Sequence, residues 1–137
     1  GTLSGNPLGK NPEDVWDIPN VKNNHPEKTD HPCQFPIELI ERLVLSMTNP
    51  GDIVLDPYLG VGSAICAAVI HNRKGYGSDI MKEYLDIAEE RIKAAADGTL
   101  ERRLMGTPVY QPTNGVKLAE TPDEFKKARE NLFGSRF

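Results

Sequence analysis

The segment Asp56-Pro57-Tyr58-Leu59-Gly60-Val61-Gly62-Ser63 has the composition of a ligand-binding loop between a strand and a helix. Gly60 and Gly62 permit a sharp turn and let a ligand approach the main chain without a Cβ in the way. The free N–H groups at the start of the next helix favour a carboxylate or a phosphate. A glycine pair alone fits a plain strand-to-helix turn equally well. A second feature is therefore needed to distinguish a ligand-binding loop from such a turn.

That second feature is Asp79, which lies 23 residues after Asp56 (79 − 56). An acidic residue about 20 residues after a glycine loop is the usual partner of the two ribose hydroxyls. Asp79 can also cap the helix that follows, because its two carboxylate oxygens can serve different partners. The loop and the acid together predict a nucleoside ligand. The dinucleotide pattern is incomplete, since Ile65 stands at its third glycine, and no Gly-Lys-Ser/Thr follows to form a P-loop.

Hydrophobic periodicity predicts the elements that would position these residues. They are a helix over 36–48, an apolar strand over 53–56, a helix over 63–72 that Gly75 stops, a strand over 76–79, and a helix over 81–96 that Gly98 ends. A short strand is also expected at 15–18. The alternation of helices and strands indicates an α/β fold with a parallel sheet.

Composition limits the classes of protein. The 137 residues carry a net charge of −4, without the basic patch that an autonomous duplex-binding domain needs. Cys33 and Cys66 lack metal-ligand spacing, and Cys66 is expected to be buried. No apolar stretch is long enough to span a membrane, and we expect a cytoplasmic protein. We expect one domain, with a ligand-binding part over 2–98 and a loop and short helix over 99–137, the latter opened by a capping box at 121–124.

Four segments resemble the motifs of the DNA methyltransferases that methylate an exocyclic amine, adenine N6 or cytosine N4. The segment 56–63 is similar to the Asp-Pro-Phe-x-Gly-Ser-Gly-Thr motif of that family. The sequence Lys-Thr-Asp-His-Pro-Cys-Gln-Phe-Pro at 28–36 looks like its Lys-x-x-His-Pro-x-x-x-Pro motif. The segment 75–92 resembles the family's ribose-binding strand and helix, and 14–19 resembles the strand placed before the His-Pro motif. The resemblance covers about residues 10–93.

This resemblance implies S-adenosyl-L-methionine as the cofactor. It also implies a Rossmann-like methyltransferase fold, with a partial, mostly parallel sheet and flanking helices. The implied cofactor-binding residues are Thr29, Asp30, His31, Pro32 and Phe35 at the methionine end, Asp56, Pro57, Tyr58, Gly60, Gly62 and Ser63 around the methionine and sulfonium, Asp79 at the ribose, and Ile80 at the adenine. Asp56 is expected near the methionine amino group. Val61 and Ala64 replace a serine and a threonine that are common in the family, so their hydroxyl contacts are lost. His31 also fits a loop histidine packed beside prolines and is not expected to be catalytic.

One family motif is missing. Amino-methylation requires a base flipped out of the duplex, which the family holds with an Asp/Asn/Ser-Pro-Pro-aromatic tetrapeptide. No such tetrapeptide occurs in the sequence, and Asp56-Pro57-Tyr58 is one proline short. We therefore expect the C-terminal, cofactor-binding portion of such an enzyme, inactive alone. DNA would be bound mainly by a separate catalytic and recognition portion, and the partner would be a catalytic-half chain or a second copy.

Two other interpretations remain open at this point. The chain could be a non-catalytic cofactor-binding or scaffolding remnant of such an enzyme. It could also be a fragment of a nicotinamide-dependent oxidoreductase, which the His-Pro motif and the missing third glycine disfavour.

Overall fold

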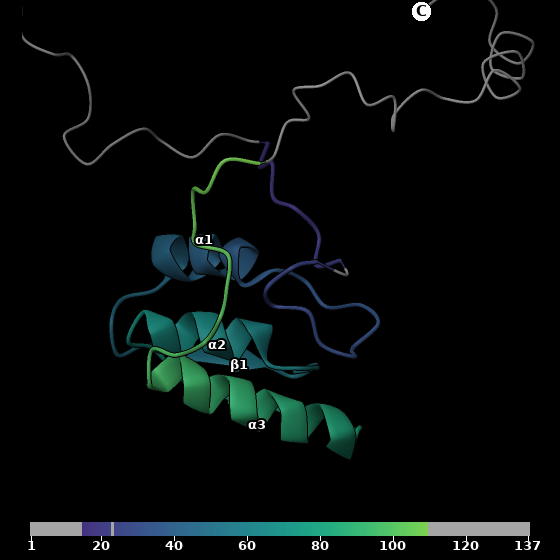
Figure 1. Cartoon of the computed structure of the whole chain (residues 1–137). Coiled ribbons are helices and arrows are strands. Elements are labelled where there is room, and N and C mark those ends of the chain that lie inside the picture. The colour runs from purple at the N-terminus through teal and green to yellow at the C-terminus, as the bar shows by residue number, and fades with distance from the viewer. Residues whose placement is uncertain (1–14, 23, 110–137) are drawn as a thin grey trace, which may run out of the picture.

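A computed structural model of the chain describes residues 15–22 and 24–109, and these form an α/β unit (Figure 1). Its elements are α1 (Ile37–Met47), β1 (Ile53–Asp56), α2 (Ser63–Ile70), β2 (Lys74–Gly77) and α3 (Lys82–Ala96). The two strands pair in parallel, with Ile53 opposite Lys74 and Asp56 opposite Gly77. The expected α/β class, with a small parallel sheet and flanking helices, is confirmed.

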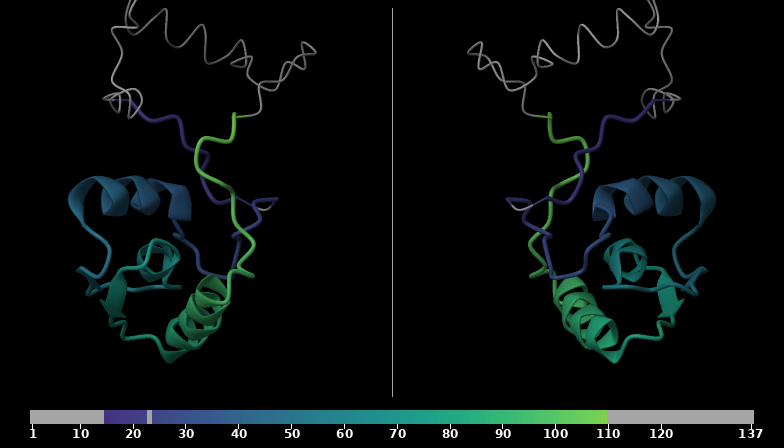
Figure 2. Two further views of the ribbon diagram at one scale, coloured as in Figure 1. Left: turned by 90° about the vertical axis from the view of Figure 1, so that its left-hand side faces the viewer. Right: turned by 90° about the vertical axis from the view of Figure 1, so that its right-hand side faces the viewer.

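The three helices lie side by side on one face of the sheet, with α2 in the middle (Figures 1 and 2). Helix α2 packs against both strands and against both other helices, so its small side chains form the centre of the core. Cys66 and Ala67 are fully buried there, as is Ile37 of α1, and Ala95 of α3 is buried beside them. The small side chains of α2 let this helix lie close to the sheet.

Several predicted boundaries shift. Helix α2 ends at Ile70, and the chain reverses at Asn72, which takes a positive φ of 61°. Gly75 was predicted to stop this helix, but it lies inside β2, opposite Val54. A Cβ at position 75 would come within 2.3 Å of the side chain of Ile65, so the glycine is needed for helix-to-sheet packing.

Two further differences concern the ends of the described chain. Strand β2 begins and ends two residues earlier than predicted, so Asp79 lies beyond the strand. The strand expected at 15–18 is not formed, because a strand requires a neighbouring strand and none lies beside this segment in residues 15–22 and 24–109. Trp16 contacts the guanidinium of Arg42 instead, at 5.4 Å from the ring centre. The capping box at 121–124 lies outside the described residues.

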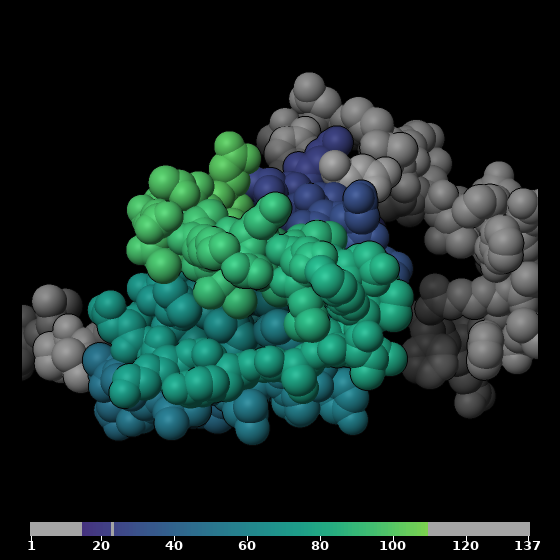
Figure 3. Space-filling model, turned by 90° about the horizontal axis from the view of Figure 1, so that it is seen from below, coloured from purple at the N-terminus to yellow at the C-terminus, as the bar shows by residue number. Residues whose placement is uncertain are grey.

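Residues 99–109, which we call the strap, return from α3 and cross α1 (Figure 1). Arg102 donates two hydrogen bonds to the carboxylate of Glu41, at 2.8 and 2.9 Å, and Arg103 pairs with Glu38. Both glutamates belong to α1 and are fully buried. In Figure 3 the strap (light green) lies beside the segment that precedes α1 (purple to blue), where the Arg103 N–H reaches Glu27. Buried carboxylates need such partners, so the strap is part of the fold.

The other face of the sheet is bare in the described part of the chain (Figure 2). Ile53, Leu55 and Tyr76 point to it and are 64, 70 and 57% exposed; we call them the apolar sheet face. An apolar groove of about 420 Å³ also runs between α1 and β1. Contiguous exposed apolar surface of this kind promotes association. Within the described residues no helix is long and apolar enough to cross a membrane.

We predict that the apolar sheet face makes the chain associate as its concentration rises. Leu55→Lys should lower both the associated fraction and the binding of a hydrophobic dye, because it places a charge in the middle of the face. Light scattering and dye fluorescence measure the two effects. Leu104→Lys is the matched control, since Leu104 is a similarly exposed leucine on the strap. A monodisperse wild-type monomer that binds no dye would contradict the prediction.

Candidate functional site

A cleft of about 270 Å³ lies at the carboxyl ends of β1 and β2, where ligands of open α/β sheets bind. It brings together the segment before α1, the glycine loop and the acid after β2. The lining residues are His31, Cys33, Gln34, Phe35, Tyr58, Leu59, Gly60, Val61, Ser63 and Asp79. Residues from three of the segments that the sequence singled out thus meet in one hollow.

The glycine loop requires its glycines. Gly60 and Gly62 have φ values of 52° and 77°, in the left-handed region that side chains rarely adopt. A Cβ at Gly60 would lie 3.3 Å from the imidazole of His31, and one at Gly62 would lie 3.1 Å from the Cβ of Ala88 in α3. Gly62 also precedes the first residue of α2, so the loop presents a helix start to the cleft.

Asp79 links the glycine loop to α3 through its two oxygens. Oδ2 accepts a hydrogen bond from the Gly60 N–H at 2.9 Å, and Oδ1 accepts one from the Met81 N–H at 2.9 Å. These N–H groups, Met81 first and then Gly60, hold the pKa of Asp79 below its ordinary value, so the carboxylate is charged at neutral pH. Each oxygen keeps a lone pair for a further donor, such as a hydroxyl group. Helix capping and ligand binding are therefore compatible in this geometry.

His31 stands between the glycine loop and α3. Its Nδ1 accepts a hydrogen bond from the Cys33 N–H at 3.2 Å, which ties the ring to the main chain of its own segment. Its ring packs edge-on against Tyr84 of α3, with centroids 4.5 Å apart, and its other nitrogen faces Gly60. The imidazole thus has a packing role that accounts for its position without any proton transfer.

The predicted residues are only partly gathered in the cleft. His31, Phe35, Tyr58, Gly60, Ser63 and Asp79 line it, whereas Thr29, Asp30, Pro32, Asp56, Pro57, Gly62 and Ile80 do not. Asp56 accepts the Tyr58 N–H at 3.0 Å and lines the apolar groove beside β1. Tyr58 and Ile80 follow the ends of neighbouring strands and are 87 and 98% exposed, so each offers an apolar surface near the cleft.

Gln34 is a buried residue that shapes the segment before α1, and this structural role was not predicted from the sequence. Its amide oxygen accepts hydrogen bonds from the N–H and the hydroxyl of Thr29, at 3.1 and 2.8 Å. Its amide nitrogen donates to the Glu27 carbonyl at 2.7 Å. Only its place inside the His-Pro motif could have drawn attention to it, because a single polar residue in a loop has no periodic signal.

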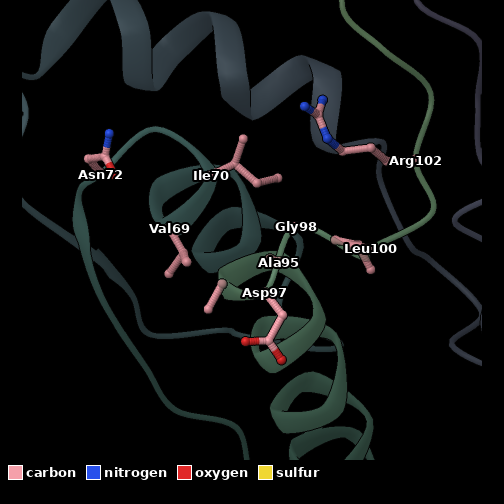
Figure 4. A pocket seen from close by; sticks show the side chains of 9 residues that line it. Val69, Ile70, Asn72, Ala95, Asp97, Gly98, Leu100 and Arg102 are labelled. Atoms are coloured by element: carbon pink, nitrogen blue, oxygen red, sulfur yellow. The ribbon is translucent and has the colours of Figure 1, made fainter.

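A second hollow, of about 370 Å³, lies at the opposite end of the helices (Figure 4). Val69, Ile70, Ala95 and Leu100 give it apolar walls, and its charged side chains are Asp97 and Arg102. Arg102 is already bound to Glu41. No cluster of metal-binding side chains occurs in the described ranges of the chain. The cleft beside Asp79 is therefore the stronger candidate for binding.

Residues 2–90 match the model of the N6_N4_Mtase family, described as DNA methylase. The chain belongs to this DNA methylase family. It is 54% identical over 97 residues to the type II methyltransferase M.BglII of Bacillus subtilis, covering 71% of this chain and 27% of that protein. It is 43% identical over 100 residues to M.ScaI of Streptomyces caespitosus, covering 70 and 33% of the two chains. Our chain thus spans between about a quarter and a third of the length of these relatives.

Similar solved structures include the complex of M1.HpyAVI with SAM. Its sequence is 34% identical to our chain, with a TM-score of 0.48, over 61% of this chain and 42% of that one.

The two cysteines should differ sharply in reactivity. Cys33 is exposed and lines the cleft, whereas burial raises the pKa of Cys66 to about 11 and keeps its thiol protonated at neutral pH. We predict that iodoacetamide near neutral pH modifies Cys33 and spares Cys66 in the folded chain. Peptide mass spectrometry reads out both sites, and denaturant, as the control, should make both react. Equal modification without denaturant would contradict the burial of Cys66.

Proposed function

We propose that this chain binds S-adenosyl-L-methionine in the cleft and is the cofactor-binding portion of a DNA amino-methyltransferase. The observation that carries the proposal is the bridge from Asp79 to Gly60, because it joins an acid suited to ribose hydroxyls to a glycine loop suited to an anion. Family membership supports the reaction class. Family membership also removes support from the interpretation of the chain as a fragment of a nicotinamide-dependent oxidoreductase.

The residues present fit this cofactor. The helix start at Gly62–Ser63 suits the methionine carboxylate, and His31 and Phe35 line the same cleft. Thr29, Asp30 and Pro32 belong to the segment that holds these two side chains in place. Asp79 is assigned to the ribose hydroxyls, and the exposed Ile80 to the adenine ring.

The bound cofactor supplies a methyl group from its sulfonium, and this chain's residues bind and orient it. Asp56, Pro57 and Tyr58 carry the chain from β1 to the glycine loop. We assign them to the methionine amino group and the sulfonium.

The target base requires a second set of residues. The 137 residues contain no Asp/Asn/Ser-Pro-Pro-aromatic tetrapeptide, and their net charge is −4. Phosphate contacts and a pocket for a flipped base must therefore come from other polypeptide. We propose that a catalytic-half polypeptide supplies both, and that the apolar groove is suited to its binding, since Phe35 and Tyr58 line both groove and cleft. The alternative, a non-catalytic remnant, keeps cofactor binding and predicts no such complement.

We predict that Asp79→Ala weakens cofactor binding about tenfold or more, because hydrogen bonds to a charged group are lost. Calorimetry with S-adenosyl-L-methionine measures the effect. Asp86→Ala is the matched control, since Asp86 is an exposed aspartate of α3 paired with Lys82. The cofactor should raise the melting temperature of the wild-type chain, and NAD should not. An unchanged affinity in Asp79→Ala would remove the ribose assignment.

A second prediction is that the purified chain alone transfers no methyl group to DNA. Incubation with cofactor carrying a tritiated methyl group and with duplex DNA should leave the DNA unlabelled, because no base pocket is encoded. The M.BglII methyltransferase serves as the positive control in the same assay. Clear incorporation by the chain alone would contradict the proposal that another polypeptide must supply the site for the target base.

A further inference from the structure

Arg91 of α3 is a buried cation directly behind the glycine loop. Its residue is 7% exposed. Nη1 donates hydrogen bonds to the carbonyl oxygen of Val61 and, at 3.3 Å, to the hydroxyl of Ser63. Val61 and Ser63 line the cleft, whereas Arg91 does not. Arg91 is therefore not placed to contact a ligand in the cleft directly.

The contact fixes one peptide unit of the loop. The Val61 carbonyl is held by Arg91, and the N–H of the same peptide unit, which belongs to Gly62, donates to the Leu59 carbonyl at 2.9 Å. A peptide unit is planar, so fixing both of its ends fixes its orientation. Gly62 immediately precedes the first turn of α2, so the orientation of this peptide unit also sets the orientation of that turn.

The positive charge of Arg91 has no counter-charge in salt-bridge contact, although the carboxylate of Glu27 favours it from beyond that distance. Arg91 forms no salt bridge within residues 15–22 and 24–109, and its buried Nη2 has no hydrogen-bond partner there. Burial lowers the pKa of the guanidinium, which nevertheless stays charged at neutral pH. A cation at the start of a helix is also unfavourable, since that end of the helix is itself positive. A simple packing role would be filled better by a neutral side chain.

We propose that Arg91 is a positioning residue for the methionine end of the cofactor. Its hydrogen bonds to Val61 and Ser63 set the helix start in the shape that receives the carboxylate, and its charge lies on the far side of the loop from that anion. The proposal rests on the proposed function, because it assigns a role within the same cleft. The nucleoside end, assigned to Asp79 and Ile80, does not depend on it.

The test compares two ligands that share the nucleoside end. S-adenosyl-L-methionine carries the amino-acid group, and 5′-methylthioadenosine lacks it. Calorimetry gives both dissociation constants for the wild type, Arg91→Met, Arg91→Lys and the control Lys93→Met, which removes an exposed charge from the same helix. The quantity compared is the dissociation constant of 5′-methylthioadenosine divided by that of S-adenosyl-L-methionine. Partial unfolding lowers both affinities by the same factor, so this ratio reports positioning alone.

We expect Arg91→Met to weaken S-adenosyl-L-methionine about tenfold relative to 5′-methylthioadenosine, the scale of losing charge-assisted hydrogen bonds. Arg91→Lys, which keeps the charge but not the forked geometry, should restore part of this ratio, and Lys93→Met should match the wild type. An unchanged ratio in Arg91→Met overturns the proposal. If Arg91→Met does not fold, the ratio in Arg91→Lys decides: a lowered ratio supports the proposal and a wild-type ratio overturns it. Failure of the wild type to bind either ligand instead overturns the proposed function.

Discussion

Parallel pairing of β1 with β2 is the constraint on which the rest of the structure depends. The ladder continues beyond the strands, since the Ser78 N–H donates to the Asp56 carbonyl at 3.1 Å and the Leu59 N–H donates to the Ser78 carbonyl at 2.9 Å. Because both strands run the same way, the glycine loop and Asp79 leave the sheet at one edge. The bridge from Asp79 to Gly60 is thus a consequence of strand direction.

Close packing imposes a second constraint, which explains where small residues stand. Gly75 lies against Ile65 at a distance that leaves no room for a further carbon atom, and a Cβ at Gly62 would make a tight contact with Ala88, at 3.1 Å. The glycine loop is therefore fixed at two points: Gly62 packs against α3, and the Gly60 N–H is hydrogen-bonded to Asp79. A site of main-chain groups can be specific only if the main chain is fixed in this way.

Much of this arrangement could be predicted from the sequence, and the failures have physical reasons. Apolar periodicity gave α1 and α3 nearly to the residue, and the spacing of Asp79 from the glycines gave the core of the cleft. Gly75 was misassigned because a glycine after a helix is ambiguous between a stop and a close contact, and Asn72 made the turn instead. Gln34 and Arg91 act through hydrogen bonds to loops, and no sequence period marks such contacts.

The strap has a consequence for the order of folding. Arg102 and Arg103 are 61 and 65 residues away from the glutamates of α1 that they neutralise. A ribosome adds about 5–20 residues per second, so several seconds separate the synthesis of the two partners. Until the arginines emerge, Glu38 has only Arg42 as an ionic partner, at 3.3 Å, and Glu41 has only His71, at 2.8 Å, so packing α1 against α2 buries two carboxylates with incomplete charge compensation. The buried carboxylates of α1 therefore gain their full set of partners only after Arg102 and Arg103 have been synthesised.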